Sequence, residues 1–351
     1  MSLYDKVLGC LVGSASADAI GAATECRTTE QIKKYFGGLV KDFQDPPNDT
    51  FAQGNKAGQC TDDFWQGYFI LNSIIKFKGA VNFDVVKDGF SYWIKHPNYL
   101  NFTGPTTRQA MSLIFGDNRQ SFQGSLEDKS SPVAKNIIND GNSKASNGGA
   151  MKIFSAAVIN PGNFDKTLKD ACEITKFTHN NTLSISGACA VACAISEALK
   201  EDTNMDAIID AGIRGAKEGF DLAVKENASE VAGPGVVSRI KLAVEIADKH
   251  SSWEDAMVEI GDVIGNGLHV SEAVPAAFGL VKASKGNPLD GIFGGVNIGN
   301  DTDTIAIMVG GILGAWKGIE AFPKHYLETI DKMNNMDLKK TAQEVVDLVN
   351  K

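Results

Sequence analysis

Apolar residues recur at helical spacing along most of this 351-residue chain, and runs that alternate between apolar and polar residues are nearly absent. The first helical stripe is Leu3, Val7, Leu11, Ala15 and Ala19. Spacings of three and four residues are typical of helices that bury one face, whereas a half-buried strand needs a period of two. The pattern therefore predicts an all-α fold, a compact orthogonal multi-helix bundle with few strands.

The expected helices number roughly a dozen. They lie near residues 2–22, 62–77, 83–95, 107–115, 147–158, 165–178, 183–201, 205–224, 236–247, 253–263, 272–283, 304–318 and 337–349, with a short one after Pro323. Residues 26–58 carry turn signals and read as irregular. Residues 116–146 read as a long polar loop with one short helix at 132–140. No linker divides the chain, so we expect one domain over residues 1–351.

The composition argues against several functional classes: nucleic-acid-binding, membrane-associated and zinc-binding proteins. The chain is 43% hydrophobic and 22% charged, with a net charge of −9. Such an acidic surface disfavours nucleic acid and anionic membranes as partners, and no signal peptide or bilayer-spanning stretch is evident. The six cysteines include no C-x-x-C pair and the five histidines are scattered, so a zinc site is not expected. We expect a reduced, cytoplasmic protein, with a monomer favoured over an oligomer.

The most unusual stretch is residues 297–304, Asn-Ile-Gly-Asn-Asp-Thr-Asp-Thr, which follows Gly294 and Gly295. We interpret the glycine-rich approach as a tight loop that can come close to a ligand. Asp301 and Asp303 are two positions apart and cannot share one helical face, so Asp301 is expected on the loop and Asp303 or Thr304 near the helix start. Hard oxygen ligands at this density suit a divalent cation such as Mg²⁺. Helix capping is the alternative, but it explains only one of these side chains.

A second acidic pair, Asp62 and Asp63, follows Thr61 at the start of another predicted helix. Thr61 is a good N-cap, and acids in the first turn complement the helix dipole. Adjacent carboxylates repel each other unless a cation or hydrogen-bond donors compensate. The two acidic pairs together could build a two-metal centre that activates a water. Capping plus a solvated surface remains the alternative for each pair.

Two further motifs are compatible with a ligand but not specific. Asn147-Gly148-Gly149 stands at the start of a predicted helix, where free N–H groups attract a phosphate or sugar phosphate. A plain turn before the helix explains this motif equally well. His179 follows an apolar helix, where a histidine is more often a C-terminal residue than a catalytic one. No G-x-G-x-x-G or G-x-S-x-G motif occurs, which excludes the usual dinucleotide and nucleophile-elbow signatures.

In order and spacing, these motifs resemble the ADP-ribosylglycohydrolases, a group that includes the dinitrogenase-reductase activating glycohydrolases. The resemblance extends from about Leu3 to Gly318. It rests on Asp18-Ala19-Ile20-Gly21 with Glu25, Gly58-Gln59-Cys60-Thr61-Asp62-Asp63, Asn147-Gly148-Gly149-Ala150-Met151-Lys152, Thr178-His179, Gly265-Asn266-Gly267 and Gly299-Asn300-Asp301-Thr302-Asp303-Thr304.

The resemblance implies an all-α fold with two Mg²⁺, or sometimes Mn²⁺, at the base of a cleft. Thr61, Asp62, Asp63 and Asp303 would hold one ion. Asp301, Asp303 and Thr304 would hold the other, with Glu25 nearby and Asp303 as the bridge. The family cleaves the bond between C1″ of ADP-ribose and an acceptor, so the implied substrates are ADP-ribosylated proteins or small ADP-ribosyl conjugates. Asp62 or Glu25 would assist proton transfer. Together with the bridging Asp303, these two acids are the catalytic residues that the resemblance implies.

The resemblance also implies substrate contacts. Gly104, Pro105 and Thr106, together with Asn147, Gly148 and Gly149, would contact the distal ribose and diphosphate. His179 and Leu268 would line the nucleotide portion. The chain departs from the family pattern at several positions, notably Lys152 for the usual arginine and Asn300 for a common glycine. Two other functions stay open: a nucleosidase that cleaves a simpler ribosyl N-glycoside, and a catalytically silent relative that binds ADP-ribose or serves a structural role.

Overall fold

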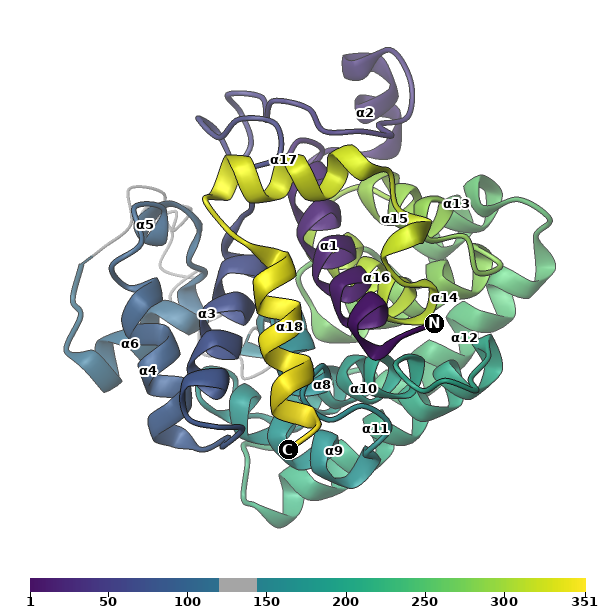
Figure 1. Ribbon diagram of the computed structural model, residues 1–351. Coiled ribbons are helices and arrows are strands. Elements are labelled where there is room, and N and C mark those ends of the chain that lie inside the picture. The colour runs from purple at the N-terminus through teal and green to yellow at the C-terminus, as the bar shows by residue number, and fades with distance from the viewer. Residues whose placement is uncertain (120–143) are drawn as a thin grey trace, which may run out of the picture.

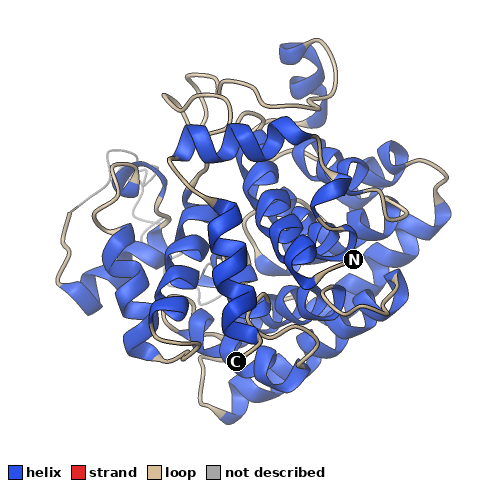
Figure 2. Ribbon diagram, in the orientation of Figure 1, coloured by secondary structure: helices blue, strands red, loops and turns tan. Residues whose placement is uncertain are grey.

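A computed structural model describes residues 1–119 and 144–351 of the chain. Within these residues it contains 17 α-helices and two short 3₁₀ turns, and no strand beyond two isolated β-bridges (Figure 2). The all-α prediction is therefore confirmed. The expected short helix at 132–140 lies outside the described residues.

Figure 1 labels most of the helices. Their bounds are α1 Leu3–Gly21, α2 Thr29–Phe36, α3 Asp62–Lys76, α4 Phe83–Trp93, α5 Tyr99–Phe102, α6 Pro105–Phe115, α8 Phe154–Ala157, α9 Phe164–Lys176, α10 Thr182–Ala198, α11 Met205–Lys225, α12 Val236–Lys249, α13 Trp253–Val263, α14 Val270–Ala283, α15 Pro288–Asn297, α16 Thr302–Lys317, α17 Lys324–Asn334 and α18 Leu338–Val349. The two 3₁₀ turns are η2 Asn147–Gly149 and η3 Ile319–Ala321.

The centre of the fold is the pair α1 and α16, which lie side by side in the middle of the molecule (Figure 1). Glycines let the two backbones approach closely. A Cβ atom on Gly310 would lie 2.2 Å from the carbonyl oxygen of Gly13, and one on Gly314 would lie 2.2 Å from that of Gly9. The C-terminal helices α17 and α18 pack on α1 from the other side. This close pair sets the spacing between Asp18, near the end of α1, and Asp303, at the start of α16.

Three local expectations were wrong. Helix α2 lies in the segment predicted to be irregular, where Thr28 and Gln31 form a capping box and Gly37 ends the helix in the left-handed region. Gly294 and Gly295 belong to α15 and not to a loop; a Cβ on Gly295 would lie 2.7 Å from Ala306 Cα in α16, so close helix packing explains that glycine. The helix expected at 147–158 is broken into η2 and the short α8.

No helix in the described part of the chain is both long and apolar enough to cross a membrane.

Candidate metal centre

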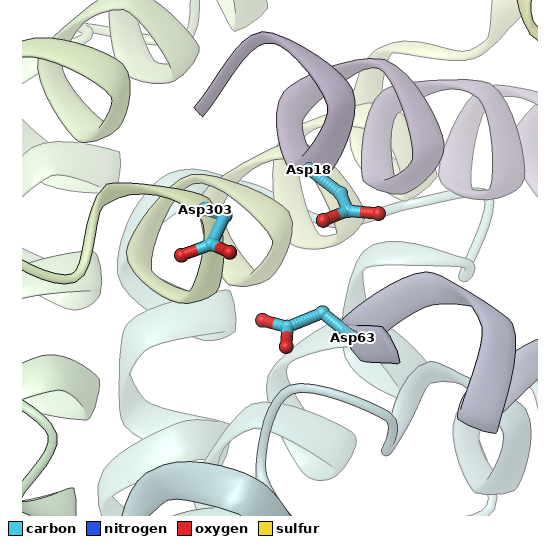
Figure 3. Close-up of side chains that lie close together, drawn as sticks. All are labelled: Asp18, Asp63 and Asp303. Carbon is cyan, nitrogen blue, oxygen red and sulfur yellow. The ribbon is translucent and has the colours of Figure 1, made fainter. Parts of the chain in front are cut away.

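Three carboxylates from distant parts of the chain meet beside the α1–α16 pair. Asp18 comes from the last turn of α1, Asp63 from the first turn of α3 and Asp303 from the first turn of α16. Each offers an oxygen, and these oxygens all lie within 4.8 Å of one another. Figure 3 shows the three side chains pointing toward one another. All three are buried.

A second group of the same kind shares Asp303. Oxygens of Glu25, Asp301 and Asp303 also lie within 4.8 Å of one another, and Glu25 and Asp301 are buried too. The Glu25 loop and the Asp301 loop are joined by backbone hydrogen bonds: the N–H of Cys26 donates to Asn300 O at 2.8 Å, and the N–H of Asn300 donates to Arg27 O at 2.8 Å. The structure thus brings both predicted acidic motifs and Glu25 into one site.

Thr61 both caps helix α3 and hydrogen-bonds to a carboxylate of the site. It is the N-cap of α3, as its position predicted, and its side chain accepts a hydrogen bond from the N–H of Asp63. The same hydroxyl donates to Asp18 Oδ1 at 2.6 Å, and the Thr61 N–H donates to Asp18 Oδ2 at 2.8 Å. On the facing helix, Thr304 Oγ1 donates to Asp63 Oδ2 at 2.7 Å. Both threonines therefore hold carboxylates of the site in place.

Asp18 was not among the predicted site residues. The signal was available, because Asp18 is the one acidic residue in a helix end made of small and apolar residues, Ala15 to Gly21. A charged residue that is fully buried needs a partner or an ion. The sequence could not show that the partner is Thr61, 43 positions further along the chain.

Asp62 lies outside both groups of close oxygens. It is buried, and its Oδ2 accepts a hydrogen bond from Gln66 Nε2 at 2.7 Å, one turn further along α3. Burial raises the pKa of Asp62 to about 8, the charge of Asp18 adds to that shift, and the charge of Lys152 opposes it. Asp62 is therefore a carboxyl near the metal groups that can hold or release a proton close to neutral pH.

Burial dominates the electrostatics of the whole site. It raises the pKa of Asp18 to about 7 against the hydrogen bonds from Thr61. It raises the pKa values of Glu25, Asp63 and Asp303 well above the usual range, and each of these acids is raised further by the charges of its neighbours. Carboxylates that are buried together can ionise only if positive charge joins them. Hard, closely spaced oxygens of this kind fit Mg²⁺ or Mn²⁺.

The Asn147-Gly148-Gly149 turn reaches this site. The side-chain amide of Asn147 donates to Asp301 Oδ2, and its backbone N–H donates to Leu268 O at 2.9 Å. The Leu268 side chain beside it is 64% exposed. Asn147 and Leu268, which are far apart in the sequence, are therefore both at the edge of the metal groups.

His179 lies beneath the same turn and is buried. Gly148 sits directly against its ring, because a Cβ at this position would lie 2.7 Å from His179 Cε1. Nε2 of the ring is 2.8 Å from Ser146 Oγ, and Nδ1 is 2.8 Å from Thr178 Oγ1. Both ring nitrogens are thus engaged within the protein, and burial lowers the pKa of His179 well below its usual value.

Gly104, Pro105 and Thr106 form the start of α6, with Gly104 as the N-cap and Pro105 in the first turn. Among the described residues, no hydrogen bond joins these three to the metal groups. They are therefore positioned by their own helix, α6, and do not belong to either group of close carboxylate oxygens.

Comparison with known proteins shows the family of this chain. The family model for ADP-ribosylglycohydrolase matches residues 1–351. Among similar proteins is the uncharacterized protein YegU of Escherichia coli, 25% identical over 341 residues, with 96% of this chain and 95% of YegU covered. Another is the ADP-ribosylhydrolase ARH3 of Homo sapiens, 22% identical over 352 residues, with 94% of this chain and 90% of ARH3 covered.

Among solved structures, one titled "ADP-ribosylglycohydrolase-related protein complex" has the same fold. The TM-score is 0.63 at 18% sequence identity, and the match covers 99% of both chains. The family match over the full chain, together with the shared fold, identifies this protein as a member of the ADP-ribosylglycohydrolase family.

Proposed function

We propose that this protein is a Mg²⁺-dependent hydrolase that cleaves the glycosidic bond at ribose C1″ of ADP-ribosylated side chains or small ADP-ribosyl conjugates. The observation that carries the proposal is the convergence of two carboxylate groups on Asp303, with all their members buried. A protein that only bound ADP-ribose, or had a structural role, would have no need to bury so many acids together. Retention of the whole acidic set argues against the catalytically silent alternative.

The proposed function places two divalent cations at these oxygens. Asp18, Asp63 and Asp303 would hold one, with Thr61 beside it, and Glu25, Asp301 and Asp303 would hold the other, with Thr304 beside it. Asp62, which the sequence put among the ligands, would act on the water from outside both groups. The hydrogen bonds suit this assignment, because Thr61 and Thr304 direct their hydroxyl protons to Asp18 and Asp63 and keep oxygen lone pairs for a cation. When bound, such ions would grip ribose hydroxyls and lower the pKa of a water.

The protein side chains would supply the proton transfers. Gln66 holds Oδ2 of Asp62, which leaves Oδ1 of this carboxyl to accept a proton from the attacking water. Glu25 is the second candidate, since its loop lies against the Asp301 loop on the other side of Asp303. The negative charge of the surrounding acids would stabilise positive charge that develops at the ribose carbon in the transition state.

The remaining predicted residues would bind the rest of the substrate. The turn at Asn147, Gly148 and Gly149 lies next to Asp301 and would place the diphosphate beside the metal site. The exposed side chain of Leu268 would contact the nucleotide portion, and Gly104, Pro105 and Thr106 would contribute from α6. His179 would support this surface from beneath the turn, since both of its ring nitrogens are bonded inside the protein.

A hydrolysis screen tests the proposal. Purified protein with Mg²⁺ is offered arginine-, serine- and O-acetyl-linked ADP-ribose and free nucleosides, and released ADP-ribose or base is measured. We expect hydrolysis of at least one ADP-ribosyl linkage, loss of activity in EDTA and recovery with Mg²⁺ or Mn²⁺. Activity on nucleosides alone would favour the nucleosidase alternative, and activity that is insensitive to chelation would refute the metal mechanism.

A further inference from the structure

A continuous line of polar side chains runs beneath the Asn147–Gly149 turn. It begins at Lys152, which is fully buried and donates from Nζ to Gly148 O and, at 3.1 Å, to Thr178 Oγ1. Thr178 Oγ1 is 2.8 Å from His179 Nδ1, and His179 Nε2 is 2.8 Å from Ser146 Oγ. Ser146 is partly exposed. The line therefore leads from the buried Lys152 to the hydroxyl of a partly exposed residue, Ser146.

The direction of these hydrogen bonds follows from the donors. A lysine ammonium has protons only, so Thr178 Oγ1 must accept from it. Burial lowers the pKa of Lys152 to about 7, against the charges of Asp62 and Asp63, so the ammonium form predominates at pH 6. Nδ1 of His179 is the one other polar side-chain atom within hydrogen-bond distance of Thr178 Oγ1 among the described residues, so the Thr178 proton points to Nδ1.

The tautomer of His179 is then determined. A neutral imidazole that accepts at Nδ1 carries its proton on Nε2, and burial favours the neutral ring. The Nε2 proton is donated to Ser146 Oγ. Because that oxygen accepts, its own hydroxyl proton points elsewhere and is available to a ligand. Ser146 directly precedes Asn147, whose amide contacts Asp301, so it stands on the edge of the metal site.

We propose that Lys152 is a positioning residue, which acts through Thr178 and His179 to make Ser146 a hydrogen-bond donor toward the bound ligand. The ligand identity rests on the proposed function: the diphosphate of ADP-ribose offers only acceptor oxygens at this turn, and a hydroxyl with a directed proton is complementary to it. Lysine at position 152, where the resemblance leads one to expect arginine, delivers its protons to two acceptors from a single nitrogen.

The tautomer can be measured without any assay of activity. Long-range ¹H–¹⁵N NMR spectra of the histidine side chains are recorded at pH 6, and the His179 signals are assigned by their loss in His179→Gln. We expect an Nε2–H tautomer in the wild-type protein, its loss in Lys152→Met and its recovery in Lys152→Arg. Lys6→Met is the matched control, since Lys6 is also buried and donates to two backbone carbonyls, those of Ala198 and Lys200, away from His179.

An Nδ1–H tautomer in the wild type, or an unchanged tautomer in Lys152→Met, would overturn the inference. If Lys152→Met does not fold, Thr178→Val interrupts the same line one step later and should give the same loss of the Nε2–H tautomer. This readout is independent of hydrolysis, so it can succeed or fail whatever the protein hydrolyses.

Calorimetry with ADP-ribose tests the ligand step. Ser146→Ala should weaken ADP-ribose binding about 10-fold, the size expected for loss of one hydrogen bond to a charged group. Ser112→Ala, on α6, is the control and should leave the affinity unchanged. Lys152→Met should weaken binding by a similar factor. The double variant should bind ADP-ribose no more weakly than either single variant, because both changes act on the same contact.

An unchanged affinity in Ser146→Ala would overturn the ligand step, whereas a wild-type protein that does not bind ADP-ribose would instead refute the proposed function.

Discussion

Asp303 is the residue on which the candidate site depends, because it belongs to both groups of close carboxylate oxygens. Its neighbours in those groups come from α1, from α3 and from two loops, so no other side chain can take its place. Its burial next to Asp301 raises its pKa well above the usual range. Without cations this acid destabilises the fold at neutral pH, and in the proposed two-metal centre it would bridge the ions.

Replacing Asp303 by asparagine should therefore have opposite effects on function and on metal-free stability. We expect hydrolysis to fall by at least about 10²-fold, since the metal-dependent activation of water is lost, and metal content measured by atomic absorption to fall with it. The melting temperature in EDTA should rise, because the folded protein no longer has to keep this buried acid protonated at neutral pH. Asp248→Asn, at an exposed position, is the control. Full activity of Asp303→Asn in metal-defined buffer would contradict the assignment.

The raised pKa values also predict how stability depends on pH. In the unfolded chain these carboxyls lose their protons near their ordinary pKa of 3.8. In the folded protein burial raises the pKa to about 7 for Asp18 and to about 8 for Asp62, so each carboxyl stays protonated up to that pH. Between these limits the folded state binds more protons, so its stability falls as pH rises, by about 1.4 kcal/mol per pH unit for each such carboxyl.

Urea unfolding of the metal-free protein between pH 4.5 and pH 8 would measure this dependence. We expect the free energy of unfolding to decrease steadily over that range, with a shallower slope for Asp62→Asn. A stability that rises toward pH 8 in EDTA would show that the buried carboxyls are already ionised and compensated within the protein.

At the scale of elements, the distance between Asp18 and Asp303 is set by the glycine contacts of α1 with α16. Gly310→Ala would place a Cβ 2.2 Å from Gly13 O, a contact that can be relieved only by separating the helices. We expect a loss of about 1–3 kcal/mol of stability and a weaker affinity for Mg²⁺, measured by calorimetry, because the carboxylates move apart.

The control for this prediction is Gly235→Ala. Gly235 lies at the start of α12 with φ −68°, and its nearest neighbour would be 4.0 Å from the added Cβ. Its stability and Mg²⁺ affinity should match those of the wild type. Equal behaviour of the two variants would indicate that the helix pair tolerates separation without disturbing the site.

The elements also show which parts of the site could be predicted from the sequence. The start of α3 was predictable because capping is local: Thr61, Asp62 and Asp63 lie within three residues. Helix α15 was not predictable from its glycines, since Gly295 is required by a neighbour, Ala306, and not by a turn. Asp18 was missed for the same reason, because its role depends on a contact with another helix. Features that depend on residues within one helical turn could be predicted from the sequence, whereas features that depend on contacts between helices could not.

At the scale of the whole molecule, the site joins segments near residues 18, 25, 63 and 301–304, so it exists only when the chain is folded. The α1–α16 pair brings the two ends of this range together, and α3 is held to them by the Thr61–Asp18 and Thr304–Asp63 hydrogen bonds. Cations that bridge these segments would act as cross-links between elements that are otherwise held by packing. Metal binding and folding stability should therefore be coupled.

The last prediction follows from this coupling and from the buried protons. A ligand that binds only the folded state stabilises it by RT ln(1 + [L]/Kd), about 2.7 kcal/mol at a hundredfold excess over Kd. Mg²⁺ must displace protons from the raised-pKa acids at pH 6 but fewer of them at pH 8. Calorimetric melting with and without Mg²⁺ should therefore show a larger gain in melting temperature at pH 8 than at pH 6. Equal gains would mean that the ions bind elsewhere, and a gain that persists in Asp303→Asn would exclude the carboxylate site as their location.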